Sequence, residues 1–509
     1  MSEKKDMGAE VFRFGGKWMA IIPVIIFLIG CVYLFIVAKA FDMVALGAAG
    51  FLGLILTAFF VKDWGKYWQY IIDGISSPMN GTLIMILFVV GIFTKLVAAA
   101  GVAEGFVWLG ATLGVTGGVF TGFTFITACV IASATGTSIG TIFGTIPILY
   151  PAGVLLGANP VLLAGAILSG AIFGDNLAPV SDTTIVSAST QWYSRKEGQA
   201  DIGGVVATRF KYAVIAAAGA LILYVVFGGN GSASGVDGGS EILQKYMRPQ
   251  GLLMLIPVGV LLFISIKTKD IFKALIWGTL IGTVVGLAFG VFTFESVISI
   301  KNGSVGGFVF NGVNNMVGTV TFCIALFGII GLMDKVGLTD HIVQSLAKSK
   351  MASTPRGTEI VLAAGVMINS VLLGAATGPA LIMFGPIGDR IGKTQKLHPY
   401  RRANLLDGFS NTLPIIQPLS AFVFIMTAAI QGIMKDYTFI TLPGPFQLMG
   451  ATFHPMFLFV VLAFSVATGW SRSYEGEGGK EVYSRKNEIP KECLRSEEHT
   501  SELQSPNTI

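Results

Sequence analysis

Residues 174–184 are Gly174-Asp175-Asn176-Leu177-Ala178-Pro179-Val180-Ser181-Asp182-Thr183-Thr184. They follow an uncharged apolar run, residues 160–173, that is long enough to enter a bilayer. Ionisable side chains at membrane depth are costly, so they are usually paired, face a cavity and mark the path of an ion or substrate. Proline breaks a helix, and irregular backbone is tolerated at this depth only where it lines a cavity. The stretch therefore predicts the ion site of a secondary transporter.

The composition is that of a protein that crosses a membrane many times. Of the 509 residues, 53% are hydrophobic and 12% are charged, and the mean hydropathy is +0.72. Soluble domains carry about 25% charged residues, so this chain is too apolar for that class. The net charge of +5 gives no indication of nucleic-acid binding, because Lys and Arg gather in loops between apolar runs. We expect no cofactor, since the four cysteines lack metal-ligand spacing: Cys31, Cys129, Cys323 and Cys493.

Runs of about 20 apolar residues predict an all-α polytopic membrane protein with about ten full spans and two re-entrant hairpins. In each half, one hairpin has short apolar arms around a polar tip, and one broken transmembrane helix is interrupted by polar residues. The hairpins are expected at 118–156 and 357–387, and the broken helices at 160–194 and 403–434. The expected divisions are a cytoplasmic segment 1–17, a first helix and first repeat 18–228, a second repeat with the final helix 229–468, and a cytoplasmic tail 469–509.

The second half of the chain echoes the first. Asn176-Leu177-Ala178-Pro179 corresponds to Asn411-Thr412-Leu413-Pro414, and Pro151 corresponds to Pro386 at the same shift. Matches in one order at one shift indicate an internal repeat, although chance similarity among Gly/Pro-rich spans is the alternative. The turn 155–160 is uncharged, whereas its counterpart 389–402 carries five basic residues: Arg390, Lys393, Lys396, Arg401 and Arg402. Basic loops stay cytoplasmic, so we expect the two repeats to be inverted and both termini to be cytoplasmic.

The C-terminal tail is polar from Gly469 onward, and this composition predicts disorder. Residues 495–505, Arg-Ser-Glu-Glu-His-Thr-Ser-Glu-Leu-Gln-Ser, resemble the conceptual translation of a common DNA-sequencing adapter. We therefore expect the natural C-terminal sequence to be replaced from about Arg495, and we assign this segment no function.

Asp175 and Asp182 are the candidate sodium ligands. Burial favours the protonated form of a carboxyl group, so such a group can hold a proton near neutral pH. Hard cations prefer oxygen ligands, which carboxylates, hydroxyls and backbone carbonyls supply. Proton and sodium would then compete for the same oxygens. The alternative is that an aspartate caps a half-helix; this fits Asp182 nearly as well, whereas Asp175, followed at once by Asn176, is the stronger ion ligand.

Hydroxyl groups near both breaks can complete the ligand set. Ser181 and Thr183 flank Asp182, and the tip of the first hairpin offers Thr135, Thr137, Ser138 and Thr141. Helix packing is an equal alternative for the tip, because small hydroxylated residues also bond back to carbonyls of their own helix.

The second copy is chemically different. It places Asn369 at its hairpin tip and Asn411 at its helix break, but Ser410 and Gln417 where the first copy has its aspartates. We expect it to bind a neutral part of a substrate or to support the fold. Asp407 lies near the edge of a span and is expected to be solvated.

Two motifs together resemble a known family. Thr135-Gly136-Thr137-Ser138-Ile139-Gly140-Thr141 followed by residues 174–184 is similar to the NhaC-type sodium/proton antiporters, whose pattern is a TGTSWGT-like segment and then GDKLSPLSDTT. Asp175, Pro179, Ser181, Asp182, Thr183 and Thr184 match, whereas Asn176, Ala178 and Ile139 depart from the pattern. The resemblance implies paired hairpins and a homodimer, and members that exchange malate or lactate keep an organic anion open as substrate.

The sequence thus predicts a secondary transporter and not an enzyme: a sodium/proton antiporter with a membrane carboxylate that binds proton and sodium in turn. The alternative is a sodium- or proton-coupled organic anion exchanger, and a distant one is an intramembrane aspartyl protease. Expected partners are sodium, protons, the lipid bilayer, a second copy of the chain and a small organic anion. The expected location is the bacterial cytoplasmic (inner) membrane.

Overall fold

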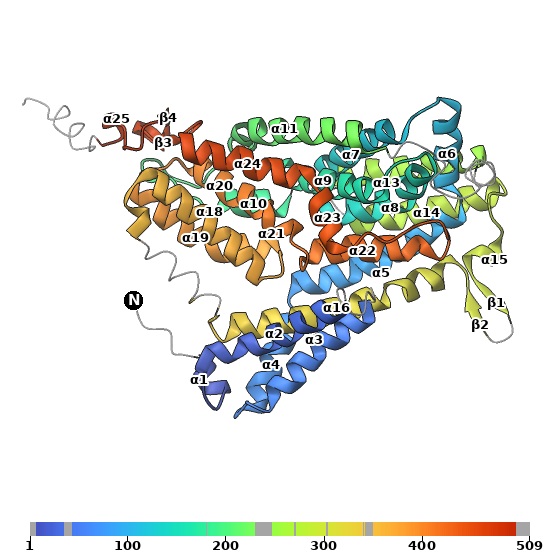
Figure 1. The fold of residues 1–509 in the computed structure, drawn as a ribbon, viewed down its shortest axis with the longest axis horizontal. Coiled ribbons are helices and arrows are strands. Elements are labelled where there is room, and N and C mark those ends of the chain that lie inside the picture. The colour runs from blue at the N-terminus through green and yellow to red at the C-terminus, as the bar shows by residue number, and fades with distance from the viewer. Residues whose placement is uncertain are drawn as a thin grey trace, which may run out of the picture.

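The computed structural model describes residues 7–34, 43–179, 181–229, 247–268, 271–301, 304–338, 341 and 350–494. Within these ranges the chain is mostly helical, which confirms the expected all-α architecture. The exceptions are two small antiparallel hairpins, β1 (Ser299–Lys301) with β2 (Ser304–Gly306) and β3 (Ser473–Glu475) with β4 (Glu481–Tyr483). The helices form an elongated bundle (Figure 1).

One layer of the bundle combines the N-terminal helices with one helix from the middle of the chain. Its members are α1 (Met7–Val11), the 3-10 helix η1 (Gly16–Ile21), α2 (Ile22–Val32), α3 (Met43–Ala58), α4 (Trp64–Ile75), α5 (Pro78–Ala99) and α16 (Phe308–Lys335). The long helix α16 packs against α3, α4 and α5 (Figure 1). Glycines allow this close approach: a Cβ on Gly91 of α5 would lie 2.4 Å from the carbonyl oxygen of Gly312 of α16.

The rest of the first half contains residues 174–184, which predicted the ion site. Its helices are α6 (Val102–Thr112), α7 (Gly117–Thr135), α8 (Ser138–Leu155), α9 (Pro160–Leu177), α10 (Asp182–Ser189) and α11 (Ile202–Phe227). α9 packs along α7, and Gly170 and Gly174 of α9 lie against the backbone of α7. The predicted break after residue 177 is confirmed, because Pro179 cannot continue the helix and disfavours the helical conformation of the residue before it.

The second half repeats this order of a helical hairpin followed by a broken helix. Its elements are η4 (Pro249–Met254), α13 (Leu255–Thr268), α14 (Ile271–Ala288), α15 (Phe294–Val297), η5 (Lys350–Ser353), α18 (Pro355–Leu372), α19 (Thr377–Thr394), α20 (Pro399–Ser410), α21 (Leu413–Ile416), α22 (Ala421–Met434), α23 (Pro445–Ala451) and α24 (Phe453–Thr468). α18 and α19 lie side by side, as do α7 and α8. The order of elements supports the repeat, and the inversion of the copies stays a prediction.

The hairpins differ in one respect from expectation. They turn where predicted, at Gly136 in the first and at Gly374 and Ala375 in the second, all with positive φ. Their arms are 18 or 19 residues long, however, and the expectation of short arms is wrong. The reason is that the polar tip residues join the helices: α8 begins at Ser138 and α19 begins at Thr377.

Length and composition identify four described helices that can cross a membrane: α8, α9, α11 and α16. Three bent pairs raise this number to seven if each pair is one span: α5 with α6, α20–α21 with α22, and α23 with α24. Five further apolar helical segments have 10–17 residues. The chain is therefore a multi-pass membrane protein, and the number of about ten spans stays a prediction.

The start of the tail is ordered, so the prediction of disorder from Gly469 is wrong for residues 469–494. This segment forms β3, β4, the 3-10 helix η6 (Glu477–Gly479) and α25 (Lys491–Leu494). Arg472 is fully buried and donates to Glu359 of α18 (2.7 Å), and Glu475 accepts from the backbone N–H groups of Ser194 and Arg195 (2.7 Å each). The polar composition of the tail predicted solvated side chains, but these charged residues bind partners on the helical bundle instead. Residues 495–509, which hold the adapter-like sequence, lie outside the described residues.

Several basic residues that lie between apolar runs in the sequence, where a loop is expected, are inside the protein. Arg209 lies in the second turn of α11, and Arg401 and Arg402 lie in the first turn of α20; all three are buried. Arg401 pairs with Glu359 (2.8 Å) and Arg402 with Asp389 (3.1 Å). Lys393 also pairs with Asp389 (2.8 Å), so three of the five basic residues that oriented the repeats have an acidic partner.

We expect Gly174→Ala to destabilise the protein, because a Cβ there would lie 2.2 Å from Cβ of Ala132 and 2.3 Å from the backbone nitrogen of Ser133 on α7. Overpacking of this kind costs about 1–3 kcal/mol. Thermal unfolding in detergent, followed by fluorescence, measures it. The control is Gly144→Ala on α8, where a Cβ meets nothing within 4 Å. Equal stability of the two variants would contradict the observed α7–α9 packing.

Candidate ion site at the broken helices

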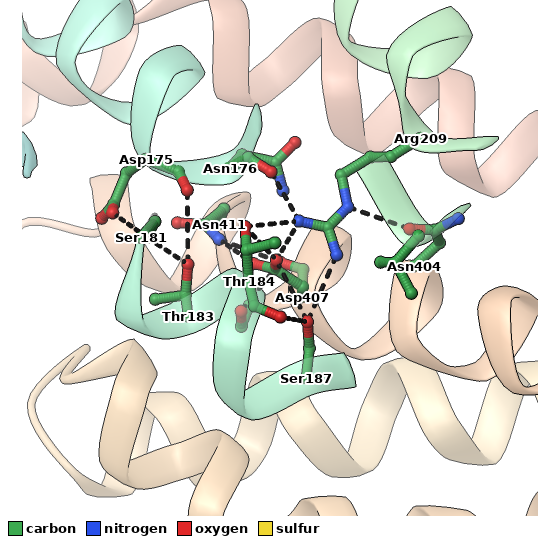
Figure 2. Close-up of polar contacts among 12 residues, drawn as sticks. Asp175, Asn176, Ser181, Thr183, Thr184, Ser187, Arg209, Asn404, Asp407 and Asn411 are labelled. Atoms are coloured by element: carbon green, nitrogen blue, oxygen red, sulfur yellow. Dashed lines mark hydrogen bonds and ion pairs between the residues drawn. The ribbon is translucent and has the colours of Figure 1, made fainter. Parts of the chain in front are cut away.

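The carboxylate of Asp175 lies where the tip of the first hairpin meets the break between α9 and α10. Its Oδ2 accepts a hydrogen bond from the hydroxyl of Ser138 (2.6 Å), and its Oδ1 accepts one from the hydroxyl of Ser181 (2.5 Å; Figure 2). Asp175 is 5% exposed, and both serines are buried. The structure therefore brings together three residues that the sequence proposed as ion ligands, from two separate motifs.

Local backbone geometry explains how the serines reach this carboxylate. Gly136 takes the left-handed conformation that ends α7, and Thr137 is the N-cap of α8, with its Oγ1 accepting from the N–H of Gly140 (3.4 Å). Ser138 is thereby the first residue of α8. Ser181 stands at the N-cap position of α10 but makes no capping bond there. Its hydroxyl is free of that task and donates to Asp175.

The remaining residues of the motif extend this arrangement. Thr183 shares a hydrogen bond with Ser181 (3.0 Å) and donates weakly to the backbone carbonyl of Asp175 (3.4 Å). Asp182 is the first residue of α10, and its side chain lies outside the described part of the structure. The N-cap position belongs to Ser181, so the alternative that Asp182 is the N-cap is wrong by one residue.

Several buried polar atoms around the breaks have no hydrogen-bond partner among the described residues. They include both side-chain heteroatoms of Asn176, Oδ1 of Asn369, Oγ of Ser370 and Oδ1 of Asn411. A buried polar atom without a partner costs about 1–3 kcal/mol. A cation coordinated by these oxygens, or a water molecule hydrogen-bonded to them, would remove the cost. Polar atoms of this kind are the expected lining of an ion path.

A second ionic cluster, which the sequence did not predict, adjoins the break. Arg209 of α11 and Asp407 of α20 form a buried ion pair, and Arg209 also donates to the backbone carbonyl of Asn176 (2.5 Å). Thr184 and Ser187 of α10 contribute hydroxyls to the same pair (Figure 2). The guanidinium thus links three broken or neighbouring segments: the end of α9, α10 and α20.

The expectation that Asp407 is solvated is wrong, because its side chain is fully buried. A sequence signal was present: Asn411 follows Asp407 by four residues on one helix, and its Nδ2 donates to Oδ1 of Asp407 (2.6 Å). For Arg209 the signal was the helix start at Ile202, with Asp201 as its N-cap, which places Arg209 inside a helix and not in a loop.

The other predicted residues are distributed as follows. Asn411 reaches the cluster through Asp407, whereas Asn369 donates to the carbonyl of Ala380 within its own hairpin (2.8 Å). Thr141 donates to the carbonyl of Thr137 (2.8 Å), which is the packing role that was the alternative for the hairpin tip. The side chain of Thr135 lies outside the described part. Among the described residues no group of three or more His, Cys, Asp or Glu side chains could hold a metal ion. The oxygens described against the carboxylate of Asp175 are the hydroxyls of Ser138 and Ser181.

Comparison with known proteins bears on this arrangement. Residues 11–229, which contain Ser138, Asp175, Ser181 and Arg209, match the model of the Na⁺/H⁺ antiporter family. The match covers less than half of the chain, and over these residues the chain is similar to that family. The NhaC-type resemblance of the two motifs is thereby confirmed. Asp407 and Asn411 lie outside the matched range.

Individual relatives differ in what their names say they transport. An uncharacterized Na⁺/H⁺ antiporter of Haemophilus influenzae is 26% identical over 57% of this chain and 65% of its own length, somewhat less than two thirds. A malate-2H⁺/Na⁺-lactate antiporter of Bacillus subtilis is 27% identical over 67% of this chain and 73% of its own length. The Na⁺/H⁺ antiporter NhaC of Alkalihalophilus pseudofirmus is 32% identical over 24% of this chain and 26% of its own length.

We expect Arg209→Met to destabilise the protein strongly, because it leaves the buried carboxylate of Asp407 without its cation. Breaking a buried pair from one side costs about 3–5 kcal/mol, whereas replacing both partners with apolar residues is often close to neutral. Arg209→Met combined with Asp407→Leu should therefore recover much of the loss in thermal stability measured in detergent. Lys335→Met, which removes the partly exposed pair with Asp73 (3.1 Å), is the control and should change stability little. A double variant no more stable than Arg209→Met would contradict a mainly electrostatic role.

Proposed function

We propose that this protein is a sodium/proton antiporter in which the carboxylate of Asp175 binds a proton and a sodium ion in turn. The observation that carries the proposal is the pair of serine hydroxyls, from the hairpin tip and from the helix break, that converge on the two oxygens of this one carboxylate. The similarity of residues 11–229 to the Na⁺/H⁺ antiporter family supports the same conclusion.

The chemistry of a hydroxyl group suits such an exchange. A hydroxyl donates one hydrogen bond and accepts through its lone pairs. Ser138 and Ser181 can donate to the charged carboxylate, as they do here, or turn their oxygens toward a sodium ion bound beside it. The unpartnered oxygen of the neighbouring Asn176 would serve as a further ligand. When a proton occupies the carboxyl group instead, the negative charge that holds sodium is gone, so binding of the two ions is mutually exclusive.

In this proposal the positive charge of Arg209 and the negative charge of Asp407 cancel each other. Because the guanidinium neutralises Asp407, the exchanging charge is that of Asp175. The same pairing removes Asp407 as a second carboxyl group that could share a proton with Asp175, as an aspartyl protease would need. Asp407 is the buried carboxylate that the second half contributes to this region, and it is bound to a cation.

A sodium- or proton-coupled organic anion exchanger is the second candidate function. The specific observation in its favour is the similarity to a relative named as a malate-2H⁺/Na⁺-lactate antiporter over 67% of the chain. An antiporter of either kind belongs in a bacterial cytoplasmic membrane. Cytoplasmic termini and a homodimer stay predictions from the sequence.

We expect Asp175→Asn to abolish sodium-driven proton movement, because asparagine keeps the shape but neither binds the proton nor carries the charge. Proton flux is measured with a pH dye inside proteoliposomes when sodium is added outside. Asp182→Asn should retain more flux if Asp175 is the exchanging group. Asp63→Asn is the control, since Asp63 caps the partly exposed helix α4 and asparagine also caps well. Retained flux in Asp175→Asn with loss in Asp182→Asn would reverse the assignment of the two aspartates.

The two hairpin-tip residues should behave differently. Ser138→Ala removes a direct bond to Asp175 and should weaken the apparent sodium affinity, on the order of tenfold for one hydrogen bond to a charged group. Thr137→Ala removes a helix cap and should lower thermal stability by about 0.5–2 kcal/mol with less change in sodium affinity. The sodium dependence of proton flux and thermal unfolding are measured on both variants. Equal sodium dependence in Ser138→Ala and the unaltered protein would assign the serine to packing.

A further inference from the structure

A polar cavity of about 460 Å³ lies away from Asp175, where the N-terminal layer meets α22. Its lining comes from α3, α5, α16, α22 and the residues that follow α22, and these helices pack against one another in Figure 1. Cavities that bind small molecules have volumes of about 300–1,000 Å³, so this one is large enough for a ligand.

The asparagines of α16 give the cavity an unusual wall for a membrane helix. Asn311, Asn314, Asn315 and Thr319 recur at helical spacing, so they share one face of an otherwise apolar helix, and all four line the cavity. Polar residues within a membrane span face a cavity or a partner and mark a substrate path. The amide nitrogen of Asn315 is buried and has no hydrogen-bond partner among the described residues.

Lys95 places a positive charge at the same cavity. It is the only charged residue of α5, its side chain is 9% exposed, and its ammonium donates to Asp436 (2.7 Å) and to the carbonyl of Gly432 (2.7 Å). Buried pairs of this kind are weak evidence for stability, because apolar residues of similar size often stabilise a fold as well. Asp436 is about one third exposed, so it can exchange Lys95 for water without a large desolvation cost.

The two donors converge on one turn of α22. Lys95 donates to the carbonyl of Gly432, and a Cβ on Gly432 would lie 2.6 Å from the amide nitrogen of Asn315. With Lys435 also lining the cavity, the two lysines and Asp436 leave one net positive charge. Ammonium and amide N–H groups around a net positive charge recognise a carboxylate, and the further amides of Asn311, Asn314 and Gln431 suit hydroxyl groups on the same ligand.

We propose that this cavity binds a small carboxylate, with the ammonium of Lys95 and the amide of Asn315 as its donors and with Asp436 as the internal group that the ligand displaces from Lys95. The inference extends the second candidate function by giving the organic anion a site, and it needs no role for Asp175.

Equilibrium binding of radiolabelled L-lactate and L-malate to the full chain in lipid nanodiscs tests the proposal, with glycerol as the neutral probe. We expect saturable binding of a carboxylate and none of glycerol. Asp436→Asn should strengthen carboxylate binding, because it removes the competing anion. The double variant Lys95→Gln with Asp436→Asn should bind the carboxylate roughly tenfold or more weakly than Asp436→Asn alone, because one hydrogen bond to a charged group is lost. The double variant leaves no unpaired charge, which protects its folding.

A matched control variant tests whether the effect belongs to this cavity. Lys335→Gln, near the far end of α16, should bind the carboxylate as the unaltered protein does. The proposal would be overturned if neither the unaltered protein nor Asp436→Asn bound the carboxylate saturably. It would also be overturned if the double variant bound the carboxylate with the same affinity as Asp436→Asn. If the double variant cannot be purified, Asn315→Leu decides, and unchanged affinity there overturns it. Sodium-driven proton flux on the same variants reports on Asp175 alone, so each proposal can fail without the other.

Discussion

The buried pair of Arg209 and Asp407 is the interaction that joins the two halves of the chain at their broken helices. A guanidinium or a carboxylate alone in this environment would carry a large desolvation cost, so neither residue can be buried without the other. Arg209 also donates to the carbonyl of Asn176, one of the last carbonyls of α9, which the break leaves without an intrahelical partner. The position of α20 relative to the end of α9 therefore depends on this one cation.

Breaks in membrane helices are possible only when the freed polar groups find partners. Here the partners are short side chains from nearby segments: Ser138 and Ser181 for the carboxylate of Asp175, and Thr184 and Ser187 for the second ion pair. Among the described residues, both side-chain heteroatoms of Asn176 and Oδ1 of Asn411 remain without hydrogen-bond partners at the same breaks. Under the proposed function, the atoms that stabilise the break thus lie beside the atoms that would bind the ion.

The charged residues of the C-terminal part show how far composition can mislead. Glu359 is fully buried between Arg401 and Arg472, so a residue of the tail completes an ionic cluster within the bundle. On composition alone, such charged residues are placed in loops or in the tail and are therefore expected to be solvated. In a membrane protein a charge near the end of a span can instead be neutralised by another charge that is distant in sequence, and the sequence does not show which one.

The sequence by itself determined the class of protein and the positions of the hairpin tips and the helix breaks, and it named Asp175, Ser138 and Ser181 as candidate ion ligands. These follow from local rules: apolar runs must be helical in a bilayer, and glycine and proline end helices. A carboxylate at membrane depth is costly, so it usually marks a functional site. Tertiary structure decided that Arg209, Asp407, Glu359 and Arg472 are internal. It also decided that the serines of two separate motifs bind one carboxylate. Such pairings depend on which distant segments meet, and a charge has the same appearance in the sequence whether water or another charge neutralises it.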